Sequence, residues 1–138
     1  MWFLFPFKHG LEKQRKQELL DFQKKAGCKF KNISLLDIAF HHRSFSNEHS
    51  DSPINNERLE FLGDSVLGMI VATELYLAHP DKPEGDLAKI KAAVVSEDSL
   101  FPIALNLNID TYLMLGHGEE VSGGRKKKAL LADAVEAL

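Results

Sequence analysis

Acidic residues recur at helical spacing inside two otherwise apolar stretches of the chain. Glu60 and Asp64 lie four residues apart in NERLEFLGDS, and Asp133 and Glu136 lie three apart in LADAVEAL. Residues three or four positions apart are neighbours on the surface of a helix. The spacing therefore predicts two helices, each carrying a pair of carboxylates on one face.

Carboxylates held this close repel one another unless a cation binds between them. A set of oxygen donors suits Mg2+ or Mn2+, hard ions that take carboxylates together with several waters. Arg58 is the only basic residue between positions 57 and 75, so a structural ion pair is a less economical explanation than a metal. The alternative is that both pairs are solvated helix faces. The metal interpretation assumes that the acids border a stripe facing the core, formed by Leu59, Leu62, Val66, Met69 and Ile70.

The periodicity of the whole chain predicts an all-α fold, because no run of alternating apolar and polar residues indicates a strand. Breaks between helices are expected at Gly10, at Pro53, and over residues 80–83 and 116–124, and Ser34 and Ser96 are expected helix caps. The expected helices cover residues 11–25, 35–42, 57–78, 86–95 and 98–105, with a last one from residue 130 onward.

Three segments of the chain carry a family resemblance. NNERLEFLGDSVL resembles the signature helix of the ribonuclease III nuclease domain, with order and spacing matched throughout. PEGDLAKIKAAVVSEDSL resembles the helices that follow, and LGHGEEVSGGRKKKALLADAVEAL resembles the family's loop and second acidic helix. The resemblance runs from Ile33 to Leu138. We therefore expect an N-terminal segment with the first helix over residues 1–32 and a nuclease domain over residues 33–138.

The resemblance implies a metal-dependent endonuclease that hydrolyses double-stranded RNA to products with 5′-phosphate and 3′-hydroxyl ends. A phosphodiester is anionic, so attack by water needs charge neutralisation and a water of lowered pKa, and metal ions supply both. The expected cofactor is Mg2+, with Mn2+ able to substitute, and one or two ions per site remain possible. The family's metal ligands correspond to Glu60, Asp64, Asp133 and Glu136, of which Asp64 and Glu136 are the expected catalytic residues, with Glu57 and Glu84 as supporting acids.

The formal charge of −3 conceals local basic clusters. Residues 125–128 form one, following a glycine pair that would let the backbone approach a phosphate, and lysines and an arginine between residues 13 and 25 form another, whose role is open. Solvated basic faces are the alternative. Adjacent His41 and His42 point in different directions on a helix and are not expected to chelate a metal. The expected RNA contacts are His42, Arg43, Ser122, Gly123, Gly124, Arg125, Lys126 and Lys127.

Phe61 corresponds to the aromatic residue that, in the family, inserts into a second subunit, so the resemblance implies a homodimer. A core position is the alternative for such a phenylalanine. The lone Cys28 allows no internal disulfide, which agrees with a cytoplasmic protein. The apolar opening MWFLFPF is too short to span a bilayer, and we expect no membrane partner.

Typical family members continue beyond the position of Leu138 and add a double-stranded-RNA-binding domain. This chain stops two residues after Glu136, which suggests a truncated piece whose last helix is cut short. A non-cleaving RNA-binding module and a dimerisation fragment therefore stand as alternatives to the nuclease. The sequence does not identify the natural RNA substrate. The resemblance implies a role in RNA processing, such as the maturation of ribosomal RNA precursors.

Overall fold

The computed structural model describes residues 11–49 and 54–138. The expected breaks at Gly10 and Pro53 and the MWFLFPF segment lie outside these residues. The described chain is all-helical, as predicted, and within it the single bridge of His41 with Met114 is the one strand-like pairing. The helices are α1 (Lys13–Ala26), α2 (Ile33–Ala39), α3 (Arg43–Glu48), α4 (Glu57–Ala78), α5 (Glu84–Val94), α6 (Glu97–Asn106), α7 (Ile109–Tyr112), α8 (His117–Val121) and α9 (Lys128–Glu136), with a 3-10 turn η1 (Gly124–Lys126).

The long helices match the sequence prediction, and the differences involve short elements. The predicted helix over 35–42 is wrong at its end, because the backbone of Phe40 and His42 pairs with Met114 instead of continuing the helix. The break predicted over 116–124 contains a short helix of its own, α8, which the sequence prediction did not include. Helices of four to six residues are too short to reveal a periodic pattern.

One of the two predicted caps is confirmed. The Ser96 side chain accepts a hydrogen bond from the N–H of Ser99 at the start of α6. At α2 the cap is Asn32, whose side chain accepts from the N–H of Ser34, so the prediction that Ser34 caps this helix is wrong.

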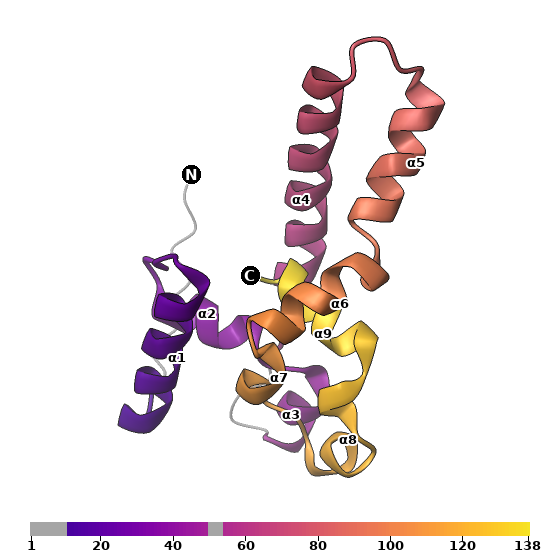
Figure 1. Ribbon diagram of the computed structural model, residues 1–138. Coiled ribbons are helices and arrows are strands. Elements are labelled where there is room, and N and C mark those ends of the chain that lie inside the picture. Colours follow the sequence, from indigo (N-terminus) through magenta and orange to yellow (C-terminus); the bar gives the residue numbers. More distant parts are fainter. Residues whose placement is uncertain (1–10, 50–53) are drawn as a thin grey trace.

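The hydrophobic core lies in a compact body built from α1, α2, α6, α7 and α9 (Figure 1). Phe22, Phe40 and Tyr112 pack with ring centroids 5.0 to 5.6 Å apart at its centre. Leu131 and Ala134 of α9 are fully buried against this body, so the second acidic helix is anchored by its apolar face.

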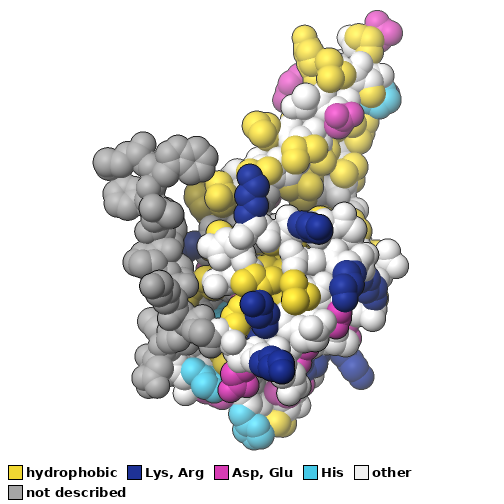
Figure 2. All heavy atoms as spheres, turned by 90° about the vertical axis from the view of Figure 1, so that its left-hand side faces the viewer, with side chains coloured by type: hydrophobic (Ala, Val, Ile, Leu, Met, Phe, Trp, Pro, Cys, Tyr) yellow, Lys and Arg dark blue, Asp and Glu magenta, His cyan; other side chains and the backbone are white. Residues whose placement is uncertain are grey.

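Helices α4 and α5 form a hairpin arm that projects from the body (Figure 1). The apolar side chains of α4 gather on the surface of this arm (Figure 2). The prediction that α4 turns an apolar stripe to the core is therefore wrong: Leu62, Val66, Met69 and Ile70 are 43 to 64% exposed. Within the described part of the chain, α4 packs chiefly on α5 along its length and on α9 at its base, so the stripe has no core to face.

By length and composition alone, α4 is also the one helix in the described part of the chain that could cross a membrane. Acids at its first turn, Glu57 and Glu60, and Asp64 in its second turn place charge at one end of this apolar helix.

The base of α4 crosses α9 with backbone against backbone at Gly63. A Cβ atom added to Gly63 would lie 1.6 Å from the carbonyl oxygen of Glu136, far inside any permitted contact. Only glycine lets the two helices approach this closely. The crossing therefore fixes where the acids of α4 lie relative to those of α9.

Replacing Gly63 with alanine should drive α9 away from α4. We expect Gly63→Ala to lower the free energy of unfolding by about 3 kcal/mol, the upper end of overpacking costs, because a backbone atom cannot move aside as a side chain can. Gly85→Ala is the matched control: this glycine is also helical but has nothing within 4 Å of an added Cβ, and the change should leave stability unchanged or raise it by up to about 1 kcal/mol. Urea unfolding measures both, and a loss below about 1 kcal/mol for Gly63→Ala would contradict the crossing.

Candidate acidic active site

The crossing of α4 and α9 brings the four predicted metal ligands to one place. Gly63 lies between Glu60 and Asp64 on α4, and its contact is the backbone of Glu136 itself, one turn beyond Asp133 on α9. The pKa of Glu136 is raised from its ordinary 4.5 to about 7, first by partial burial and then by the charges of Asp64, Asp133 and Glu60. The four carboxylates therefore share one electrostatic field.

Two further acids of the cluster respond in the same direction. Burial raises the pKa of Glu60, and the charges of Asp133, Glu57 and Asp64 raise it further. The pKa of Asp133 is raised by burial and then by the charge of Glu97. A bound cation favours the ionised form of such acids and lowers their pKa.

Glu97 was missed by the sequence interpretation. It stands in the first turn of α6, directly after the cap Ser96, where an acid is ordinarily explained by the helix dipole. Only the packing of α6 on α9 brings its charge to Asp133. No local sequence signal distinguishes it from Asp98, which instead pairs with Lys128 at 2.5 Å.

The donor set fits a hard divalent cation. The cluster offers only carboxylate oxygens, the ligands preferred by Mg2+, and Mg2+ keeps several of its waters when it binds proteins. As they stand, no three His, Cys, Asp or Glu side chains within residues 11–49 and 54–138 converge tightly enough to enclose an ion. The fit therefore rests on donor chemistry and mutual repulsion, with Glu60, Asp64, Asp133 and Glu136 as the residues that would hold the ion.

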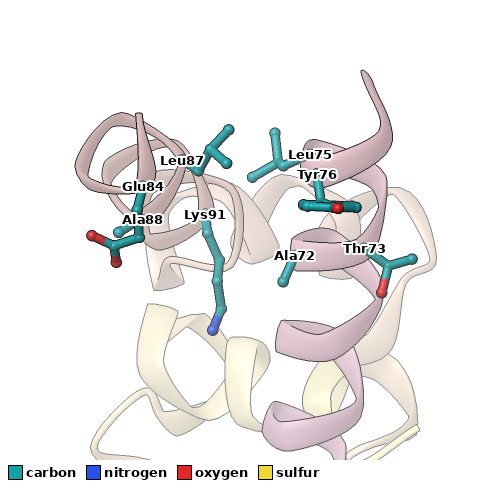
Figure 3. Close-up of a pocket in the computed structure, with 8 residues that line it drawn as sticks. All are labelled: Ala72, Thr73, Leu75, Tyr76, Glu84, Leu87, Ala88 and Lys91. Atoms are coloured by element: carbon teal, nitrogen blue, oxygen red, sulfur yellow. The ribbon is translucent and has the colours of Figure 1, made fainter. Parts of the chain in front are cut away.

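The two predicted supporting acids lie in different places. Glu57 lies beside the cluster, where its charge raises the pKa of Glu60, and its carboxylate is 3.8 Å from Arg43. Glu84 lies near the far end of the arm, at the start of α5 and in the groove lined by Tyr76 (Figure 3). Among the described residues, the structure does not bring Glu84 to the acids at the crossing of its own chain, and its supporting role stays a prediction.

His42 is held rigidly next to the acids. Its Nδ1 accepts a hydrogen bond from the N–H of Ser44 at 3.2 Å and lies 2.8 Å from the Ser44 hydroxyl, which in turn accepts from the N–H of Gly116. Because Nδ1 serves as acceptor, the neutral ring carries its proton on Nε2. Burial lowers the pKa of His42, while the charges of Glu119 and Asp133 oppose the shift. His42 is therefore a neutral donor at the edge of the cluster.

His41 has a structural role. Its Nε2 lies 3.2 Å from Asp37, whose other oxygen accepts from the guanidinium of Arg15 at 2.8 Å. Arg15 also donates to the carbonyl of Tyr112 and so ties α1 to α7. The charge of Arg15, one member of the N-terminal basic cluster, is therefore used in contacts within the fold.

Ion pairs also engage most of the basic loop. Arg125 donates to Glu120 at 2.7 Å and to the carbonyls of Asp110 and Leu113, which ties η1 to α7. Lys127 pairs with Glu119 at 2.6 Å, whereas Lys126 is exposed and has no ion pair among the described residues. Gly123 adopts a positive φ of 80°, the conformation its glycine permits. The RNA contacts expected at Ser122, Gly124 and their neighbours stay predictions.

Comparison with known proteins agrees with this architecture. A family model described as Ribonuclease-III-like matches residues 32–138. Ribonuclease 3 of Treponema denticola is 67% identical over 135 residues, which are 98% of this chain and 55% of that protein. Ribonuclease 3 of Borreliella burgdorferi is 49% identical over 124 residues, 90% of this chain and 51% of that protein. The chain thus spans about half the length of these curated relatives.

Two solved structures share the fold, and both are nuclease domains of ribonuclease III from Campylobacter jejuni. One is 40% identical with a TM-score of 0.78, covers 84% of this chain and 78% of that chain, and is described as flexible in a region involved in dimer formation. The other is 37% identical with a TM-score of 0.77 and covers 92% of this chain and 80% of that chain.

The raised pKa of Glu136 predicts a pH dependence of stability. Because this pKa is about 7 in the folded chain and near 4.5 in the unfolded chain, the folded state binds more protons between these values. The free energy of unfolding without metal should therefore fall as the pH rises from about 4.5 to about 7. Glu136→Gln should fall less steeply over this range, since the variant cannot ionise there. Urea unfolding in EDTA at a series of pH values measures the difference, and parallel curves would contradict the raised pKa.

Proposed function

The chain belongs to the ribonuclease-III-like family, and from that premise we propose that it forms the nuclease part of a metal-dependent endoribonuclease specific for double-stranded RNA. The observation that carries the proposal is the crossing at Gly63, where two acids of α4 meet two acids of α9. The relatives named Ribonuclease 3 support the nuclease assignment, and the oxygen-only donor set supports Mg2+ or Mn2+ as cofactor.

In this proposal Glu60, Asp64, Asp133 and Glu136 hold the metal. Bound Mg2+ would neutralise phosphate charge and lower the pKa of a water. The water would lose a proton as its oxygen attacks the scissile phosphorus, the bond from phosphorus to the 3′ oxygen would break, and that oxygen would take up a proton. One product therefore ends in a 5′ phosphate and the other in a 3′ hydroxyl. Asp64 and Glu136, on the two sides of the crossing, are the proposed catalytic residues.

The proposed RNA-binding surface includes His42, Arg43 and residues 122–127. The Nε2–H of His42 is a suitable donor to a phosphate oxygen, and Arg43 and Lys126 are exposed cations. Double-stranded RNA is recognised mainly through its shape, phosphates and 2′-hydroxyls, so cleavage in RNA maturation, including that of ribosomal RNA precursors, needs no base-specific pocket. We place this activity in the cytoplasm.

The proposed assembly is a homodimer formed through α4. Phe61 is 77% exposed although it is a large aromatic residue, and Met69, Tyr76 and Leu77 continue the exposed apolar surface along the same helix. Exposed apolar surfaces of this extent mark interaction sites. The dimer-forming region named for the Campylobacter jejuni domain supports the same assembly.

Cleavage tests the function directly. The 138-residue chain with a perfect RNA duplex and Mg2+ at low salt should yield products with 5′ phosphates, and EDTA should prevent it. Glu136→Gln should lower the rate by more than about a hundredfold while duplex binding persists, since disturbing even the outer partners of a metal site can cost that much. Glu12→Gln, an exposed acid outside the cluster, is the control and should cleave normally. A folded chain that binds the duplex and never cuts it would establish the non-cleaving module instead.

Phe61→Ala tests the dimer. Truncating a central aromatic anchor should weaken association by about 2 kcal/mol, which is roughly a thirtyfold rise in the dissociation constant. Val121→Ala on α8 removes an equally exposed apolar side chain, 75% exposed against 77% for Phe61, and should leave the dimer intact. Sedimentation at micromolar concentrations compares the two variants. Equal association by both would rule out Phe61 as the anchor.

A further inference from the structure

Lys91 of α5 points into the groove between the two helices of the arm. Figure 3 shows its side chain extending from α5 toward the base of the arm, past Ala72 of α4. Lower in the arm, Lys91 lines a second part of the groove together with Asp64 and Ser65 of α4. An ammonium group and one acid of the proposed active site therefore border the same open space.

Gly68 of α4 leaves the space that the Lys91 side chain fills. Gly68 is the one residue of α4 that is buried, and a Cβ added to it would lie 3.3 Å from Cε and 3.5 Å from Nζ of Lys91. The lysine stem thus occupies the space that any larger residue at position 68 would fill. Ala88 and Ala92 flank Lys91 on α5 and keep the rest of the groove open. Packing therefore fixes the direction of the Lys91 side chain, which is not free to rotate as an exposed lysine is.

The charge of Lys91 is available to a ligand. Neighbouring Lys89 is 82% exposed in its side chain and pairs with Asp86 at 3.7 Å, and Lys128 pairs with Asp98. Within the described ranges, Lys91 has no carboxylate within 4.0 Å. A lysine that is half-buried, held in one direction and not neutralised locally is suited to bind an anion that arrives from outside.

We propose that the Lys91 ammonium binds a phosphate oxygen of the RNA strand that lies in the acidic active site. The inference rests on the proposed nuclease function and adds a substrate contact to it. An RNA strand placed beside Asp64 enters the groove that Lys91 lines, and its phosphates meet repulsion from the Asp64 carboxylate there. A fixed cation in the same groove offsets that repulsion and sets the position of the strand.

The test is the salt dependence of duplex binding, measured without metal so that it does not depend on cleavage. Lys91→Met keeps the stem that packs on Gly68 and removes the charge. It should weaken binding about five- to tenfold and reduce the slope of log affinity against log salt by about one, the signature of one lost phosphate contact. Lys91→Gln should behave in the same way, and Lys91→Arg should retain the wild-type slope. Lys82→Met, at the exposed connection of the arm, is the matched control and should change neither quantity.

Sedimentation of the same samples separates the phosphate contact from an ion pair across the dimer. If Lys91→Met dissociates the dimer and the salt slope is unchanged, Lys91 contacts a partner subunit and the proposal is wrong. An unchanged slope with an intact dimer also overturns it. Wild-type cleavage, assayed in parallel, distinguishes the failures: a chain that cuts RNA with an unaltered Lys91→Met slope refutes the lysine contact alone, whereas a chain that never cuts refutes the nuclease function.

Discussion

The close contact of Gly63 with the carbonyl of Glu136 determines the arrangement of the active site. Helix α4 is otherwise attached to the body only weakly, since its length projects as an arm and its apolar residues are exposed. Helix α9 is held firmly by Leu131 and Ala134 in the core. The crossing therefore holds the base of α4 in a fixed position against the body. Glu60 and Asp64 lie there, on either side of the glycine.

This arrangement places like charges together at a cost in stability. Partial burial and the charges of neighbouring acids raise the pKa values of Glu60, Asp133 and Glu136, so the chain folds against the preference of these acids to remain apart and solvated. Buried apolar packing on the other face of α9 offsets the cost. Functional sites often combine favourable packing with unfavourable charge repulsion, and a bound ligand then neutralises the charge.

The basic residues fall into two groups, according to whether their charge is used within the fold or left for a ligand. Arg15 and Arg125 donate to backbone carbonyls and carboxylates and hold helices together, so their charges are used within the fold. Lys91 is directed by packing into a groove and keeps its charge for something outside the chain. Local sequence cannot separate these cases, because the contacts that decide them join different helices and loops.

The sequence alone determined the helical class, the full extent of α4, the cap at Ser96 and the helical spacing of the two acid pairs, because these follow from periodicity, capping and spacing within single segments. It could not show that the apolar stripe of α4 faces away from the core, since periodicity reveals an apolar face but not what covers it. It also could not place Glu97 beside Asp133, leave Glu84 at the far end of the arm, or direct Lys91 across Gly68. Those relations join residues from different helices, and only the packing of those helices against one another decides them.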